Sequence, residues 1–207
     1  MMLIACSQEP VGVTGGGGSE TIASLIPHVD GFDVKVESES AFSVTASVYS
    51  ESYSPKDTGY FHRSTILSDD NSLWRLSGLT DSVYHIFVSN PENGHIVFFR
   101  YGSGDHATEK MDEKILTSGG TLSGTVMLRY PDGTSEPVAG SSVYLPGSSF
   151  ATQTDSRGEY RFTGIPEGQY SVDAELSMYS RKGVSEEDRI EIVSDSLTIK
   201  NFIFVSP

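Results

Sequence analysis

The stretch TDSRGEYRFTGIPEGQY, residues 154–170, combines a polar turn, a short aromatic strand and a second turn. Asp155-Ser-Arg-Gly158 is typical of a turn in which the Asp side chain accepts hydrogen bonds from backbone amides and the Gly adopts positive φ. Tyr160 and Phe162 then alternate with polar residues, which predicts a strand with one buried and one exposed face. The same core is expected to receive Ile165, Tyr170, Val172 and Ala174.

The same spacing occurs 86 residues earlier, in SDDNSLWRLSGLTDSVY, residues 68–84. Apolar positions are kept between the two stretches while polar positions change, which indicates a folding unit rather than a catalytic loop. We therefore interpret the chain as two copies of one small domain that join near LTSGGTLSG, residues 116–124. The identical pairs are Asp69/Asp155, Arg75/Arg161, Gly78/Gly164 and Tyr84/Tyr170.

The composition agrees with an all-β protein of one medium or two small domains. The 207 residues include 10 Tyr, 10 Phe and 21 Gly, and aromatic residues suit the half-buried surface of a sheet. The net charge of −14 disfavours nucleic acid as a partner, because neutralising phosphates requires a surplus of Lys and Arg. A single cysteine, Cys6, allows no intramolecular disulfide.

Alternating apolar residues predict strands from Gly31 onward. Phe32, Val34 and Val36 alternate with charged residues, and the pattern returns from Phe42 to Val48. The preceding segment, SETIASLIPHVD, is expected to form a short helix capped at Ser19 or to remain irregular, and Pro27 ends it in either case. HIVFFRY, residues 95–101, carries apolar side chains on both faces, which predicts a strand covered on both sides or, alternatively, an exposed edge used for partner contact.

The second copy closely resembles the carboxypeptidase regulatory-like domain, a transthyretin-like β-sandwich common in bacterial envelope proteins. The resemblance rests on Leu122-Ser-Gly124-Thr-Val126, on Pro137-Val138-Ala-Gly140 followed by Val143 and Leu145, and on Thr152 through Tyr170. It implies a β-sandwich over residues 119–207, with little chemistry of its own. Residues 31–118 would be a degenerate copy, in which Ser72 and Ser82 replace the turn glycines.

The N-terminus resembles the lipobox of bacterial lipoproteins. Leu3-Ile4-Ala5-Cys6 supplies a small residue before the cleavage point and a thiol for acylation after it, so residues 1–5 would be the remnant of a signal and Cys6 the lipidation site. Only five residues precede Cys6, fewer than a signal needs, so either the reading frame begins further upstream or the match is a coincidence. The Gly-rich segment that follows favours the lipoprotein, with residues 6–30 as a flexible tether.

The sequence contains no motif that predicts a catalytic or metal site. HExxH, G-x-S-x-G and P-loop patterns are absent, so we expect no enzyme activity, no cofactor and no metal. His85 is expected on an outward, solvated or edge position of a strand. Calcium binding remains open, although no DxDxDG-type loop is present, because oxygen-rich loops can hold this ion. Acidic residues adjoin one another at three places in the chain, in stretches expected to be polar loops: Asp69-Asp70, Asp112-Glu113 and Glu186-Glu187-Asp188.

Sugar binding is the alternative function, because the fold family is grouped with carbohydrate-binding-like sandwiches. A sugar ring stacks on an exposed aromatic ring, and the only tryptophan, Trp74, is expected in the core. The candidate glycan contacts therefore lie in or beside the long loop of the first copy: Tyr49, Tyr53, Tyr60 and Phe61.

Together these observations predict two tandem antiparallel β-sandwiches, transthyretin-like or Ig-like, after a flexible tether. The expected function is that of a non-enzymatic lipoprotein of the bacterial cell envelope, with its domains in contact with an envelope protein or a polysaccharide. Ser7 after the lipidated cysteine favours the outer membrane in this resemblance, and the lipid would be the sole contact with the bilayer.

Overall fold

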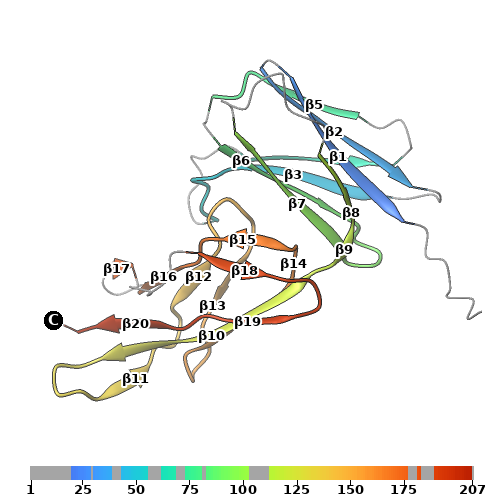
Figure 1. Ribbon diagram of the computed structural model, residues 1–207. Coiled ribbons are helices and arrows are strands. Elements are labelled where there is room, and N and C mark those ends of the chain that lie inside the picture. Colours follow the sequence, from blue (N-terminus) through green and yellow to red (C-terminus); the bar gives the residue numbers. More distant parts are fainter. Residues whose placement is uncertain are drawn as a thin grey trace, which may run out of the picture.

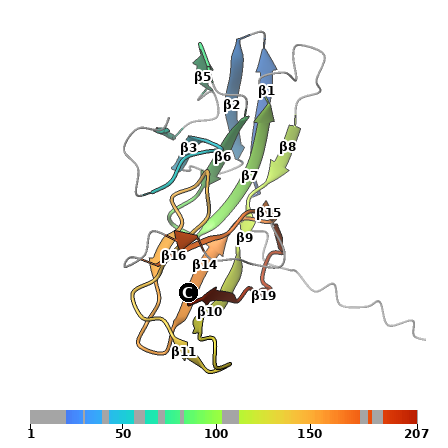
Figure 2. The ribbon, with the colours of Figure 1, turned by 90° about the vertical axis from the view of Figure 1, so that its left-hand side faces the viewer.

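The computed structural model shows two β-sandwiches that follow one another along the chain and touch (Figures 1 and 2). Every regular element in the described part of the chain is a strand, which confirms the all-β class. The described residues are 20–28, 30–38, 43–55, 62–68, 73–80, 83–102, 112–176, 181–182 and 189–206.

The first sandwich consists of two antiparallel sheets. One has the order β5-β2-β1-β8 and the other the order β4-β3-β6-β7-β9, and the second of these faces the other half of the molecule (Figure 1). Its strands are β1 (Thr21–His28), β2 (Gly31–Ser38), β3 (Val44–Ser50), β4 (His62–Leu67), β5 (Leu73–Ser77), β6 (Val83–Ser89), β7 (His95–Gly102), β8 (Asp112–Ile115) and β9 (Thr117–Ser118).

The segment before Gly31 is a strand, which corrects the prediction of a helix or an irregular tether up to residue 30. β1 pairs with β2 on one side and with β8 on the other, and Ala23 and Leu25 are buried in the first core. Pro27 pairs with Phe32 of β2 but lies beyond the residues that pair with β8, so its missing N–H removes no ladder hydrogen bond on that side. Burial of these apolar side chains on the sheet outweighs the local tendency to form a helix.

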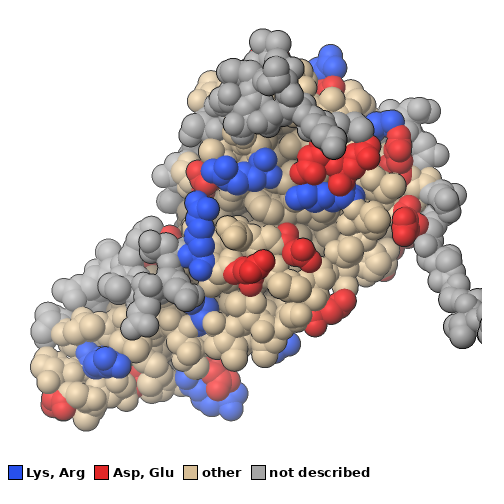
Figure 3. All heavy atoms as spheres, in the orientation of Figure 1, with Lys and Arg blue, Asp and Glu red and all other residues tan. Residues whose placement is uncertain are grey.

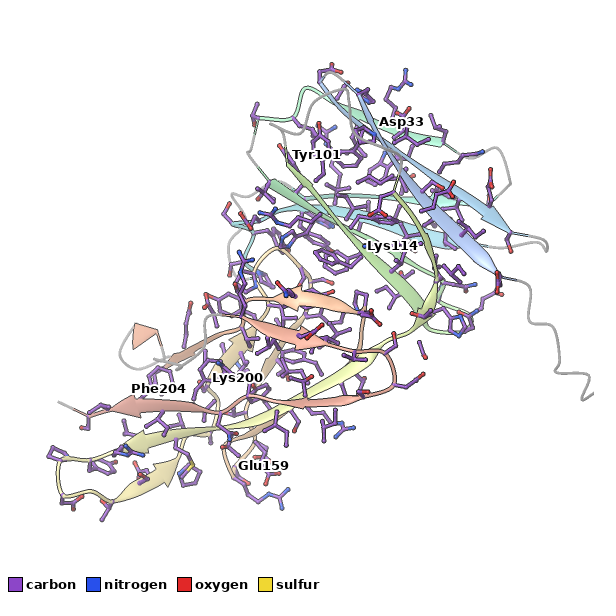
Figure 4. All side chains as sticks on the ribbon, viewed as in Figure 1. Asp33, Tyr101, Lys114, Glu159, Lys200 and Phe204 are labelled. Carbon is purple, nitrogen blue, oxygen red and sulfur yellow. The ribbon has the colours of Figure 1, made fainter. Side chains whose placement is uncertain are left out.

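The core of the first sandwich follows the alternation seen in the sequence. Trp74 is half-buried and packs against this core, and Leu76, two residues on, is buried within it. Figure 4 shows Tyr101 among the side chains between the two sheets, where its ring lies 4.9 Å from that of Phe32. Fully buried members from β2 and β3 are Phe32, Val34, Val36, Val44, Ala46 and Val48.

The second sandwich combines one strand of ten residues, β10, with mostly short strands. β10 pairs antiparallel with β14, as expected, and parallel with β19 and β20 on its other side. A second sheet has the order β13-β12-β16-β17, and β15 pairs with β18. The strands are β10 (Gly120–Arg129), β11 (Ser135–Pro137), β12 (Ser142–Tyr144), β13 (Ala151–Gln153), β14 (Glu159–Ile165), β15 (Gly168–Tyr170), β16 (Asp173–Leu176), β17 (Arg181–Lys182), β18 (Ile190–Ile192), β19 (Leu197–Ile199) and β20 (Phe202–Val205).

The turn that opens residues 154–170 has the predicted chemistry. The Asp155 carboxylate oxygen Oδ1 accepts hydrogen bonds from the backbone N–H groups of Arg157, at 2.8 Å, and Glu159, at 2.9 Å. Gly158 has a φ of 72°, a conformation that costs glycine little. The residues expected in the core are all buried: Tyr160, Phe162, Ile165, Tyr170, Val172 and Ala174. The corresponding Asp69 lies outside the described residues.

The chain passes between the two cores along an extended and closely held segment. Leu116 belongs to the first core and Leu122 to the second. Between them, Ser118 donates a hydrogen bond to the Asp195 carboxylate at 2.7 Å. A Cβ on Gly119 would come within 2.4 Å of the Gly164 backbone, so glycine is needed there for close packing. This connection is therefore packed against the second sandwich rather than free in solvent.

Candidate functional site at the junction of the two sandwiches

An aromatic contact joins the two sandwiches. Tyr49, Phe87 and Phe98 come from the first sandwich but pack within the hydrophobic core of the second. The Phe98 ring lies 5.2 Å from that of Phe87 and 5.2 Å from that of Tyr170. The prediction that residues 95–101 are covered on both sides is confirmed, because Phe99 on the opposite face of β7 belongs to the first core.

A cavity of about 740 Å³ opens beside this aromatic contact. The first sandwich contributes the turn after β3 and residues of β6 and β7, and the second contributes the end of β12, the segment from β15 to β16, and Arg189 before β18. Acidic and basic side chains are interspersed on the face of the molecule seen in Figure 3, and no large patch of one sign covers the junction.

The wall from the first sandwich is held in place from within and by the second sandwich. Within the first sandwich, Glu51 and Arg100 form an ion pair, with 3.3 Å between Oε1 and Nη2. Tyr53 lines the cavity, and its backbone carbonyl accepts a hydrogen bond from the N–H of Gly147 in the second sandwich at 2.7 Å. Its ring also leans on that of Tyr49, with 4.8 Å between centroids. The position of Tyr53 thus depends on contact between the sandwiches.

The wall from the second sandwich is polar because its strand faces alternate. Tyr170, Val172 and Ala174 point into the core, so the residues between them face the cavity. Tyr144 lies on the neighbouring strand, and its hydroxyl donates to Glu175 Oε1 at 2.5 Å. Burial and this hydrogen bond raise the pKa of Tyr144, so it keeps its proton at neutral pH. The cavity side of the segment consists of Gln169, Ser171, Asp173 and Glu175.

His85 is buried at this junction, which corrects the expectation of a solvated or edge histidine. Only 8% of the residue is exposed, and its ring meets that of Phe98 edge-on at 5.2 Å. Nδ1 makes no hydrogen bond of normal geometry with any residue the structure describes, but the Gly147 backbone lies against the ring and acts on its pKa as a hydrogen-bonding group, opposing the shift that burial causes. Burial lowers the pKa of His85, with Glu51 opposing the shift and Arg100 adding to it. The outward face of β6 was predicted correctly, but sequence could not show that the second sandwich covers it.

The predicted glycan contacts do not form one surface. Tyr49 is 5% exposed, and its ring stacks on His62 at 4.4 Å, so it is a buried contact residue and not an open platform. Tyr53 is half-buried at the cavity. Tyr60 and Phe61 lie outside the described residues, as does Cys6.

Sequence reasoning missed the residues that the second sandwich supplies. Tyr144, Asp173, Glu175 and Arg189 come from three separate segments, and each looks like an ordinary outer-face or loop residue in the sequence. The alternation of polar residues from 169 to 175 shows which side of the strand is outward. It contains no sign that another domain lies opposite.

A second charged cluster, on the outer face of the first sandwich, has a structural explanation. Arg75 donates two hydrogen bonds of 2.8 Å to the Asp33 carboxylate, its cross-strand neighbour. The Arg75 guanidinium, through these bonds, holds the pKa of Asp33 below its usual range. Figure 4 shows Asp33 on the first sandwich, on the side away from the junction. This pair neutralises a buried carboxylate and is remote from the cavity.

One of the three paired-carboxylate segments, Asp112-Glu113, lies within the described residues. Asp112 and Glu113 are exposed, and Asp112 lies 3.7 Å from the Lys114 ammonium. The pairs at 69–70 and 186–188 lie outside the described residues. Within the described ranges, no three His, Cys, Asp or Glu side chains gather as metal ligands would, and no helix long and apolar enough to cross a bilayer is present.

Residues 121–195 match the family model of the carboxypeptidase regulatory-like domain, which confirms the resemblance for the second half and covers less than half of the chain. The family is a regulatory, non-catalytic kind of domain. No curated protein sequence matches the chain.

Several solved bacterial proteins are similar to the chain at low sequence identity. The minor pilin GBS52 of Streptococcus agalactiae is 15% identical, with 83% of this chain and 86% of the pilin covered and a TM-score of 0.40. The Bacillus anthracis TIE protein is 14% identical, with 93% and 42% covered and a TM-score of 0.32. The major pilin subunit BcpA of Bacillus cereus is 11% identical, with 89% and 70% covered and a TM-score of 0.26. At these sequence identities and TM-scores, the similarity carries no information about function.

Proposed function

We propose that the protein is a non-enzymatic component of a bacterial cell envelope, anchored by a lipid on Cys6, whose two β-sandwiches act as one rigid unit in contact with another envelope protein. The observation that carries the proposal is the aromatic contact between the sandwiches. Phe98 and Phe87 of the first sandwich are buried in the core of the second, and burial of large aromatic side chains resists separation of the two sandwiches. A fixed arrangement of this kind suits the display of loops to a partner.

The attachment of the N-terminal segment supports the same proposal. Residues 6–19 lead from Cys6 to Glu20, and β1 follows directly. Because β1 is hydrogen-bonded to β2 and to β8, a pull on the anchor would load two strand pairings at once. Strands paired on both sides resist such a load better than an edge strand, which has one set of hydrogen bonds.

Lipidation is tested by metabolic labelling with a clickable palmitate analogue in a bacterial host, with the gene carried in its native upstream context. The full chain should take up label and sediment with membranes, and Cys6→Ser should lose both properties. Label that persists in Cys6→Ser, or a wild-type chain that stays unlabelled and in the soluble fraction, would contradict the envelope proposal.

The partner is tested by crosslinking on intact cells followed by affinity purification. A protein of the envelope should be recovered with the full chain and lost with Phe98→Ala, because this change frees the two sandwiches from one another. Recovery that is equal with both chains would show that the rigid junction is not required, and would contradict the role given to it.

Carbohydrate binding is the second candidate function, and the cavity is the observation that favours it. Tyr53, the one described residue among the predicted glycan contacts that is not fully buried, lines a cavity with both donors and acceptors of hydrogen bonds. Retardation in gels that contain a soluble glucan or xylan tests this function without regard to where the sugar binds.

A further inference from the structure

We propose that the cavity between the two sandwiches binds a short, uncharged oligosaccharide, with contacts from both sandwiches. The proposal rests on the second candidate function, carbohydrate binding, and names the site and the ligand class. At about 740 Å³ the cavity has the size of sites that hold small organic ligands, about 300–1,000 Å³.

The charges around the cavity argue for a ligand without charge. Glu51, Asp173 and Glu175 are acidic, while Arg100 and Arg189 are basic. An anionic ligand would meet the three carboxylates and the field of a chain of net charge −14, and a cationic ligand would meet the two guanidinium groups. A ligand rich in hydroxyl groups fits both kinds of side chain, because each hydroxyl both donates and accepts hydrogen bonds.

Tyr53 gives the cavity a half-buried aromatic ring of the kind on which a sugar ring stacks. Phe98 and Tyr144 also line the cavity, but they are 7% and 4% exposed and form its wall. Each is fixed before a ligand arrives: Tyr53 by Gly147 and by the Tyr49 ring, Phe98 by the aromatic contact, and Tyr144 by Glu175. Preorganised side chains lose little conformational freedom on binding, which favours recognition of a weakly bound, strongly hydrated ligand.

His85 is an independent sign of a functional surface. More than nine-tenths of it is buried at the cavity wall, and Nδ1 lacks a hydrogen bond among the described residues. The Gly147 backbone approaches this ring without giving Nδ1 a hydrogen bond of normal geometry, so the ring keeps hydrogen-bonding capacity at a wall shared by the two sandwiches. A hydroxyl-rich ligand at this wall would bring hydrogen-bonding groups that can use it.

The experiment measures the affinity of the full chain for linear trisaccharides by isothermal titration calorimetry. The trisaccharides are maltotriose, cellotriose, xylotriose and chitotriose. Trigalacturonic acid and trilysine serve as charged probes. Tyr53→Ala and Arg189→Ala should each weaken binding of the preferred trisaccharide about tenfold or more, a loss of about 1.4 kcal/mol. Matched changes outside the cavity, Tyr130→Ala and Arg157→Ala, should leave the affinity within about twofold. Circular dichroism melting confirms that each variant is folded.

Three outcomes overturn the proposal, and they separate it from the function on which it rests. Binding that is equal in Tyr53→Ala, Arg189→Ala and the wild-type chain would place the sugar elsewhere, so the cavity proposal would fail while carbohydrate binding stood. Tighter binding of a charged probe than of any trisaccharide would refute the ligand class. Binding of none of the trisaccharides, together with no retardation by glucan or xylan, would remove both the site and the second candidate function.

Discussion

The two sandwiches share a pattern of strand pairing but differ in what lies beside one long strand, β2 in the first sandwich and β10 in the second. In both, this strand pairs with the aromatic strand of the repeated stretch, as β2 with β5 and β10 with β14. In both, the other sheet begins with the same relation, β4-β3-β6 and β13-β12-β16. In the second sandwich, however, the last strands lie directly beside β10 and parallel to it, whereas in the first sandwich β1 is inserted between β2 and β8.

Strand β1 accounts for the different residues that the two sandwiches carry at matching places. Gly124 pairs with Tyr160, and Val34 pairs with Trp74, so these residues occupy matching places. A Cβ on Gly124 would lie 1.7 Å from the carbonyl oxygen of Lys200, to which Tyr160 also donates a hydrogen bond of 2.6 Å. In the first sandwich the neighbour is the regular strand β1, so no carbonyl oxygen has to approach β2 in this way. The matching places can therefore hold a valine and an aromatic ring without a hydroxyl.

The largest effect is expected from Gly124→Val, which gives the second sandwich the residue of the first. Backbone atoms cannot move aside as side chains can, so the free energy of unfolding of the second sandwich should fall by more than about 3 kcal/mol. Urea denaturation followed by tyrosine fluorescence measures it. As a control, Gly94→Ala has open space around it and a φ of 72°, so it should cost only about 1 kcal/mol. If both variants lost the same free energy of unfolding, the close approach of the Lys200 carbonyl to Gly124 would be contradicted.

Phe98→Ala and Phe99→Ala compare the two faces of β7. Phe99→Ala should destabilise the first sandwich by about 3–5 kcal/mol, because its ring is buried in that core. Phe98→Ala should cost about 3 kcal/mol at the junction and should split calorimetric unfolding into two transitions, because it removes the ring shared between the sandwiches. A single transition in both variants would show that the junction does not depend on Phe98.

Tyr160→Phe removes only the hydroxyl that the first sandwich lacks. The loss of its hydrogen bond to Lys200 should lower the free energy of unfolding by about 1 kcal/mol, as for a typical intramolecular hydrogen bond. Trp74→Phe is the matched change in the other sandwich, and it should act through lost packing alone. If Tyr160→Phe had no measurable effect in denaturant titration, the hydroxyl would have no part in holding the last strand.

The smallest expected effect is the pH response of the junction through His85. Its folded pKa is lowered by burial, so the unfolded chain binds the proton more readily. Stability is therefore complete above the unfolded pKa of about 6.5 and decreases as pH falls toward the lower folded pKa. The fall in melting temperature between pH 7.5 and 5.5 should be smaller in His85→Gln than in the wild-type chain. An identical fall in both would exclude His85 as its source.

Much of the second sandwich could be predicted from the sequence because its signals are local. The Asp155 turn, the alternation of Tyr160 and Phe162 and the glycine conformations depend on residues a few positions apart. The N-terminal strand was predicted wrongly for the opposite reason. TIASLIPH has no clean polar alternation, and its role is set by β2 and β8, the latter about ninety positions away in the chain.

The candidate site could be predicted only as far as Tyr53. Sequence places aromatic residues in or beside the long loop but does not distinguish Tyr49, which is buried against the other sandwich, from Tyr53, which lines the cavity. The surroundings of both tyrosines are decided by which faces of the two sandwiches pack together. The outer residues of β16 and the outer residue His85 look like ordinary solvated positions until a second sandwich is placed opposite them.

The sequence by itself determined the all-β class, the turn chemistry and the inner faces of the strands, because period-two alternation and glycine conformations act within one element. Only the tertiary structure decided that β1 is inserted into the first sandwich, that Phe98 and His85 are buried between domains, and that polar residues from both sandwiches surround one cavity. The reason is that these contacts join surfaces distant in the chain, and their energies depend on relative placement, which local patterns do not encode.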